Sequence, residues 1–155
     1  MRRRRAPKRE VIPDPKYNSE VLSHFINIIM RDGKKSVAQR IIYEALDTVE
    51  KKTKEDALKV FFDALENARP RLQVKPRRIG GATYQVPVEV SKQRGISIAL
   101  RWMRDFARNK KGKPMSVKIA DEIISAYKNE GAVIKKKEDT HKMAESNRAF
   151  AHFRF

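Results

Sequence analysis

The chain has no cysteine among its 155 residues. It therefore cannot form a disulfide framework, a thiolate nucleophile, or a cysteine-ligated zinc or iron–sulfur site. Its three histidines, His24, His141 and His152, lie on separate segments, and none has an acidic partner at a metal-ligand spacing such as H-E-x-x-H. We expect no metal site and no cofactor.

Long apolar runs are missing as well. No stretch of about 18 apolar residues is available to cross a bilayer, and no apolar segment of a secretory signal follows the basic start. Leucine, isoleucine, valine and phenylalanine still make up about 24% of the chain, above the roughly 20% below which chains stay disordered. The composition predicts a cytosolic or organelle-matrix protein with a real core and no membrane partner.

Catalytic motifs are also absent. The stretch I-M-R-D-G-K-K-S is close to a P-loop, but position 28 is Ile where the first glycine of G-x-x-x-x-G-K-[ST] must stand. The best acidic cluster is Asp121-Glu122, which falls in an expected helix near Lys118 and is interpreted as a solvated face. The sequence predicts neither an enzyme nor a small-molecule substrate.

Acidic residues are scarce in particular places. Lysine and arginine number 36 against 19 aspartates and glutamates, a net charge of +17, with +6 over residues 1–9 and +13 over residues 67–155. Five basic residues and no acid lie between Glu66 and Glu89. Two further clusters without acids are Arg2, Arg3, Arg4, Arg5, Lys8 and Arg9, and Lys110, Lys111 and Lys113. Because each neutralised phosphate releases counterions, these clusters predict nucleic acid as the partner, whereas an anionic membrane would favour one amphipathic basic helix, and none is present.

The chain divides into a tail and a single domain. Residues 1–17 are expected to form a basic N-terminal arm, because three prolines interrupt them and no apolar period appears, and we expect this arm to order only on a partner. Residues 18–155 are expected to form one helical domain that binds RNA.

Apolar residues at a period of about 3.6 predict six helices in this domain. The expected helices start at about 19, 36, 54, 92, 115 and 133. We expect Gly33 to cap the first helix in the left-handed conformation, Thr53 and Asp56 to form a capping box ahead of the third, and Gly131 to end the fifth.

The period changes to 2 over residues 71–90, which predicts a β-hairpin. The Gly80-Gly81 pair can take positive φ at its tip. Pro76 and Pro87 cannot donate to a ladder, so both strands are expected to be edges of an isolated, protruding ribbon.

Several basic positions are suited to nucleic acid. Arg77 and Arg78 flank the glycine turn, and Tyr84 is expected to offer a stacking plane. Arg31, Lys34 and Lys35 surround Gly33 beside a helix N-terminus, where backbone N–H groups favour phosphate. Lys92, Arg94 and Arg101 extend the basic surface along the fourth helix, whereas Trp102 is interpreted as a core residue.

Four motifs in this chain are similar to those of the bacterial small-subunit ribosomal protein seven family. They are S-E-V-L-S-H-F-I-N-I-I-M-R-D-G-K-K-S-V-A-Q-R-I-I-Y-E-A, R-R-I-G-G-A-T-Y-Q-V-P-V-E-V, A-L-R-W, and the C-terminal G-A-V-I-K-K-K-E-D-T-H-K-M-A-E-S-N-R-A-F-A-H-F-R-F. The resemblance runs nearly from end to end, and only the arm and the loop at 108–116 match weakly.

The resemblance implies a mainly α fold: a six-helix domain with one protruding β-hairpin arm and an extended basic N-terminal tail. It implies a cytoplasmic, ribosome-bound protein that is a primary binder of 16S rRNA and nucleates assembly of the 30S head. It further implies that the hairpin approaches exit-site tRNA at the subunit interface, and that small-subunit proteins nine and eleven are neighbours.

Charge clusters and resemblance together select the candidate contacts. The expected rRNA-binding residues are Arg2, Arg3, Arg4, Arg5, Lys8, Arg9, Arg31, Lys34, Lys35, Lys75, Arg77, Arg78, Lys92, Arg94, Arg101, Lys110, Lys111 and Lys113. The expected tRNA-proximal tip comprises Arg78, Gly80, Gly81 and Tyr84. One alternative is an architectural DNA-binding protein whose β-ribbon arm enters the minor groove; another, an RNA-modifying enzyme, lacks a cofactor motif.

Overall fold

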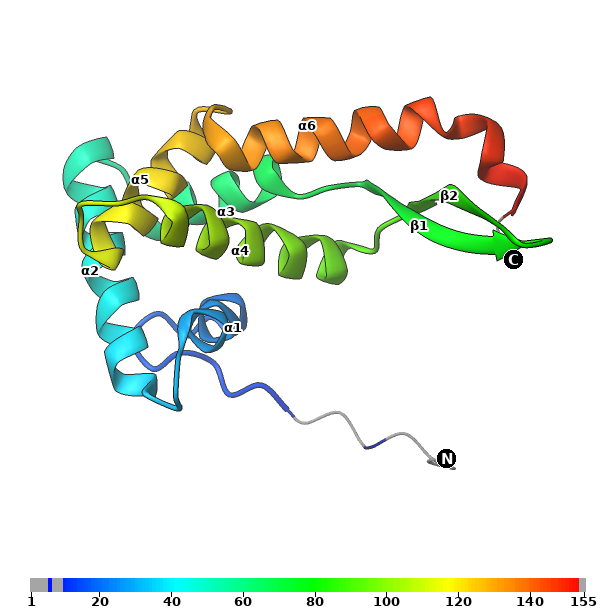
Figure 1. Ribbon diagram of the computed structural model, residues 1–155. Coiled ribbons are helices and arrows are strands. Elements are labelled where there is room, and N and C mark those ends of the chain that lie inside the picture. Colours follow the sequence, from blue (N-terminus) through cyan, green and yellow to red (C-terminus); the bar gives the residue numbers. More distant parts are fainter. Residues whose placement is uncertain (1–5, 7–9, 154–155) are drawn as a thin grey trace.

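The computed structural model describes residues 6 and 10–153, so the candidates Arg2, Arg3, Arg4, Arg5, Lys8 and Arg9 lie outside the described residues. Within the described part the chain is mainly helical with one β-hairpin, as predicted (Figure 1). The elements are α1 Glu20–Ile29, α2 Lys35–Thr53, α3 Ala57–Ala68, β1 Leu72–Ile79, β2 Ala82–Glu89, α4 Lys92–Asn109, α5 Met115–Tyr127, α6 Gly131–Ser146 and the 3₁₀ helix η1 Arg148–Phe153. None of the described helices is long and apolar enough to cross a membrane.

Helix α5 lies at the centre of the core and packs against α2, α3, α4 and α6. The apolar stripes expected from the sequence meet there. Phe25 of α1 and Phe61 of α3 stack with ring centroids 5.7 Å apart, and both are fully buried. Since burying a phenylalanine contributes about 1.5–3 kcal/mol, this pair fastens α1 to the rest of the bundle.

Two helix boundaries differ from the expectation around α1 and α3. Helix α1 ends at Ile29, and Asp32 and Gly33, both with positive φ, shape the turn that follows rather than a C-cap. The expected capping box is wrong, because Thr53 is the last residue of α2 and its hydroxyl donates to the Val49 carbonyl oxygen at 2.9 Å. Asp56 caps α3 alone.

The boundary between α5 and α6 also differs from the expectation. Asn129 takes the left-handed conformation after α5, with φ of 59°. Gly131, with φ of 90°, is the first residue of α6 instead of the end of α5. A Cβ at Gly131 would lie 3.0 Å from Ser125 Cβ, so close packing as well as conformation favours glycine here.

Part of the predicted arm packs on the domain. Asp14 is only 2% exposed. Its carboxylate accepts the backbone N–H groups of Lys16 and Tyr17 and the Tyr43 hydroxyl, the last at 2.8 Å. Burial, followed by the contact with Asp14, raises the pKa of Tyr43 to about 12. Asp14 therefore ties the segment ahead of α1 to α2.

The hairpin has the predicted strands and turn, and other elements of the chain cover part of it. Its strands pair antiparallel from Leu72 opposite Glu89 to Ile79 opposite Ala82, and both tip glycines have positive φ. Helix α6 contacts β1, and η1 contacts β2 (Figure 1). The two strands form a separate two-stranded sheet in which both are edges, as predicted, but the C-terminal segment, which the prediction did not include, covers part of it.

Candidate nucleic-acid interface

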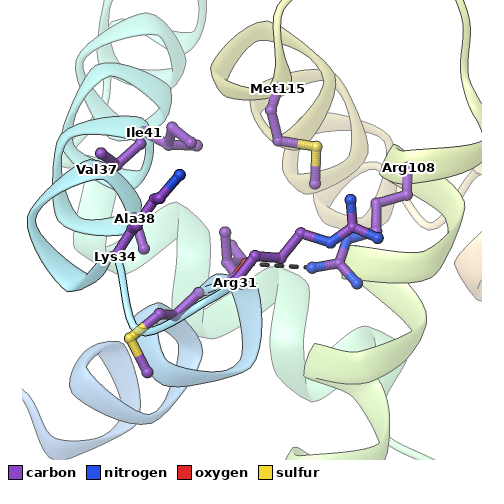
Figure 2. A pocket seen from close by; sticks show the side chains of 9 residues that line it. Arg31, Lys34, Val37, Ala38, Ile41, Arg108 and Met115 are labelled. Carbon is purple, nitrogen blue, oxygen red and sulfur yellow. Dashed lines mark hydrogen bonds between the residues drawn. The ribbon is translucent and has the colours of Figure 1, made fainter.

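A cleft with mainly apolar walls and three basic residues among its lining side chains lies where the turn between α1 and α2 meets α4 and α5. It encloses about 300 Å³. Figure 2 shows the long side chains of Arg31, Lys34 and Arg108 at this cleft, together with the apolar side chains of Val37 and Met115. Flexible cations beside an apolar wall form a surface that can take both the charged and the flat parts of a nucleotide.

Arg108 was not singled out from the sequence. It lies in the last turn of α4, 77 residues beyond Arg31, and only the packing of α4 beside α1 brings the two together. Its Nη2 donates to the Ile29 carbonyl oxygen at 3.1 Å, the dashed line in Figure 2. Burial lowers the pKa of Arg108 below its ordinary value, and the nearby charges of Arg104 and Arg31 lower it further. An anion in this cleft would relieve that crowding of positive charge.

The N-terminus of α2 opens beside the cleft. No acidic residue stands in its first turn, and within the described residues no side chain caps it. Lys34 and Lys35 are both exposed there. Uncapped N–H groups and the helix dipole favour an anion, and the phosphate-binding position around Gly33 stays a prediction that these features support.

Helix α4 carries a row of arginines. Arg94, Arg101 and Arg108 recur every seven residues and so share one face of the helix. At 1.5 Å per residue the row spans about 21 Å. Helix α4 begins beside the hairpin (Figure 1), and Arg108 in its last turn reaches the end of α1 through its bond to Ile29. Its arginine face therefore links two basic regions that are distant in the fold, while Trp102 packs against the core as predicted.

The hairpin carries exposed cations toward its tip. Lys75, Arg77 and Arg78 are all exposed, and Arg77 is paired with Tyr84 across the strands. Side chains alternate between the faces of a strand, so the basic residues lie on both faces of the ribbon.

Tyr84 differs from the expectation of an open stacking plane. Its ring centroid lies 5.3 Å from that of Phe150 and 5.1 Å from that of Phe153. The ring thus packs within the chain, on the covered side of the hairpin. Only tertiary contact decides this, since the rings are more than sixty residues apart in sequence.

The loop after α4 presents its lysines unequally. Lys110 Nζ lies 2.5 Å from Glu122 Oε1, and Lys113 Nζ lies 3.3 Å from Asp121 Oδ2. The lysine between them, Lys111, is exposed. The interpretation of Asp121-Glu122 as a solvated face is wrong for Glu122, whose residue is only 2% exposed.

Asp121 joins this loop to a second helix. It also binds Lys52 of α2, at 2.7 Å. The hydrogen bond from Lys52 and that from Lys113 hold the pKa of Asp121 below its usual value, against the opposing effect of burial. The α4–α5 loop is thereby fastened to α5 and, through Asp121, to α2.

The described candidates share one property. All of those outside the arm are exposed, namely Arg31, Lys34, Lys35, Lys75, Arg77, Arg78, Lys92, Arg94, Arg101, Lys110, Lys111 and Lys113.

The three histidines have hydrogen-bond partners within the protein: His24 pairs with Ser97, His141 with the start of β1, and His152 with Ala149. No group of three or more His, Cys, Asp or Glu in the described residues could hold a metal ion.

Comparison with known proteins covers the chain almost completely. The family model described as "Ribosomal protein S7p/S5e" matches residues 1–148. Proteins named "Small ribosomal subunit protein uS7" from Thermotoga maritima and from Fervidobacterium nodosum are each 58% identical to the chain over 155 residues, the full length of both partners. One from Thermodesulfovibrio yellowstonii is 56% identical over 154 residues, 99% of each chain.

Proposed function

The chain belongs to the ribosomal protein S7p/S5e family, and from this premise we propose that it is a primary binder of 16S rRNA that nucleates assembly of the head of the small subunit. Membership makes it a ribosomal protein of the small subunit and not an enzyme, which confirms the resemblance found in its sequence. Its place is therefore the ribosome of the cytoplasm.

The observation that carries the proposal is the cationic cleft together with the arginine face of α4. Arg31, Lys34 and Arg108 converge beside the uncapped start of α2, and Arg108 is crowded by like charge. Arg94 and Arg101 continue the charge along α4. A row about 21 Å long can neutralise several phosphates of one RNA backbone, and each contact adds counterion release.

The proposed rRNA contacts comprise the exposed basic residues described above and the basic arm of residues 1–9. Arg108 joins them, because it completes the cleft from the α4 side. Lys110 and Lys113 serve mainly as anchors, since carboxylates of α5 hold both. Lys111 is the contact that this loop offers.

The hairpin has a second role in the proposal. Its tip, with Arg78, Gly80 and Gly81, approaches exit-site tRNA, and Tyr84 supports the tip from within the protein. Small-subunit proteins nine and eleven are the proposed protein neighbours. The exposed cations and the permissive glycine turn support this role, because they allow backbone and side chains to approach a polyanion closely.

The primary test compares nucleic acids at matched salt. The protein should bind an RNA comprising the 3′ major domain of 16S rRNA far more tightly than duplex DNA, and the log of its affinity should fall steeply with log salt. Equal affinity for a random DNA duplex would favour the architectural DNA-binding alternative and contradict the proposal.

The cleft is tested with a charge reversal. Lys34→Glu with Lys35→Glu should weaken binding to this RNA and reduce the salt slope by about 1.5, the value expected for two lost phosphate contacts. The matched control is Lys51→Glu with Lys54→Glu, which makes the same charge change at the other end of α2. If both pairs weakened binding equally, net charge rather than the cleft would explain the affinity.

The hairpin is tested by deleting Arg78 to Thr83 and reconstituting small subunits. This segment lies beyond the covered part of the ribbon, so folding and incorporation should persist while exit-site tRNA retention changes. Loss of incorporation with the deletion, but not with the Lys34 and Lys35 reversal, would contradict this division of roles.

A further inference from the structure

The C-terminal segment runs alongside the hairpin and returns onto it. In Figure 1, α6 extends from the helical bundle in the direction of the hairpin, and η1 folds back onto β2. Lys137 Nζ of α6 donates to the Asn67 carbonyl oxygen at 2.7 Å, which anchors α6 beside the end of α3. This anchor lies close to the point where the chain enters the hairpin.

A second contact holds the base of the hairpin. His141 Nε2 accepts the backbone N–H of Arg71 at 2.9 Å and that of Leu72 at 3.4 Å. These N–H groups are the first of the ribbon, and the imidazole satisfies donors that a two-stranded sheet leaves at its end. His141 thus attaches α6 to the start of β1.

The third contact is an aromatic cluster further along the ribbon, formed by Tyr84, Phe150 and Phe153. The Tyr84 ring centroid lies 5.3 Å from that of Phe150 and 5.1 Å from that of Phe153. The two phenylalanine centroids are 6.4 Å apart, and their ring planes are nearly parallel. We call these three rings the C-terminal clamp. It lies outside the main core of the bundle.

A ribbon of two strands needs such support, because an isolated hairpin is marginally stable in water and free to bend at its base. On β2, Val86 is fully buried opposite Lys75, whereas on β1 every residue from Lys75 to Arg78 is exposed. Tyr84 is paired with Arg77, inside that exposed section. The clamp therefore contacts β2 opposite the exposed section of β1.

We propose that the C-terminal clamp sets the direction of the hairpin, so that Phe150 and Phe153 are positioning residues for a nucleic-acid contact made by the tip. The nucleic-acid part of this inference rests on the proposed function. The clamp itself is a property of the chain alone. Tyr84 packs against Phe150 and Phe153 within the protein, and the cations at the tip bind phosphate outside it.

The absence of cysteine allows a direct measurement of hairpin direction. Spin labels are attached through Thr83→Cys at the tip and Lys59→Cys on α3, both exposed positions. The distance distribution is measured by pulsed electron resonance in the parent, in Phe150→Ser with Phe153→Ser, and in Phe62→Ser, a control that removes an exposed phenylalanine from α3. Tyr84→Phe keeps the ring of the clamp and serves as the conservative variant.

The clamp variant should broaden the distance distribution, while the Phe62 and Tyr84→Phe variants keep the narrow parental one. If the competent direction is then populated about one tenth of the time, the affinity of reconstituted small subunits for exit-site tRNA falls roughly tenfold. An unchanged distribution in the clamp variant, or equal broadening in the control, would overturn the clamp. Broadening with parental affinity for exit-site tRNA would overturn its positioning role.

The two arms of this experiment separate two kinds of failure. The distance measurement needs no RNA, so it decides on the clamp alone. Parent small subunits that fail to retain exit-site tRNA would contradict the proposed role of the hairpin without affecting the distance result.

Discussion

Replacing Lys110 should destabilise the protein more than replacing Lys111, although the two lysines are neighbours in an exposed loop. Lys110 faces Glu122 Oε1 at 2.5 Å, and the Glu122 side chain is only 3% exposed. Its other oxygen, Oε2, has no hydrogen-bond partner in the described part of the chain. Lys110→Met would therefore leave a buried carboxylate without its counter-charge.

The size of the effect follows from this geometry. Breaking a fully buried pair costs about 3–5 kcal/mol, whereas an exposed pair contributes at most about 1 kcal/mol. Because Lys110 is itself 44% exposed, we expect an intermediate loss of about 2 kcal/mol in the free energy of unfolding. For a chain of this size that lowers the melting temperature by about 4–8 °C.

The assay is thermal and denaturant unfolding of four proteins: parent, Lys110→Met, Lys111→Met and the double variant Lys110→Met with Glu122→Met. The Lys111 variant should melt like the parent but bind RNA more weakly. The double variant should recover most of the lost stability, since no buried charge remains unpaired. Equal melting temperatures for the two single lysine variants would refute the assignment of Lys110 as an anchor.

Three further predictions concern other contacts. Burial and then neighbouring cations hold the pKa of His141 below its ordinary value. Its contribution to stability should therefore be complete above about pH 6.5 and be lost as pH falls through the lower pKa of the folded state. His141→Gln should flatten this pH dependence of the unfolding free energy, measured by urea titration. Gly95→Ala should lower the melting temperature by about 2–4 °C per kcal/mol lost although alanine has the better helix propensity, because the new Cβ would lie 3.1 Å from the Pro70 carbonyl oxygen. A higher melting temperature would show that the backbone at Pro70 moves away from the new methyl group. Tyr43→Phe should cost about 1–2 kcal/mol in unfolding free energy, because the buried Asp14 carboxylate loses the donor at 2.8 Å, and no loss would mean that water replaces it.

Local pattern was sufficient for most of the fold. Apolar residues at a period of 3.6 placed six helices, and alternation at a period of 2 placed the hairpin, because these periods follow from backbone geometry alone. The Gly80-Gly81 turn was predictable for the same reason, since positive φ there depends on the missing Cβ. Charge clustering likewise requires only counting, and it indicated a polyanion before any contact was known.

Helix ends were less predictable, because competing local partners decide them. Thr53 and Asp56 have the spacing of a capping box, yet Thr53 is the last residue of α2 and its hydroxyl donates back to the Val49 carbonyl oxygen. Similarly, Gly33 lies in the turn between α1 and α2, because α1 already ends at Ile29. In each case the residue can bond to backbone groups on either side of it along the chain, so spacing alone cannot choose between the alternatives.

By itself the sequence determined the elements, the sign of the charge and, through its motifs, the family. Tertiary structure alone decided which side chains face solvent and which face each other. It buried Glu122 under Lys110, brought Arg108 to Arg31, and turned Tyr84 onto Phe150. The reason is physical: periodicity reports which face of an element is apolar, whereas the partner of a polar or aromatic side chain depends on segments tens of residues away that meet only when the core packs.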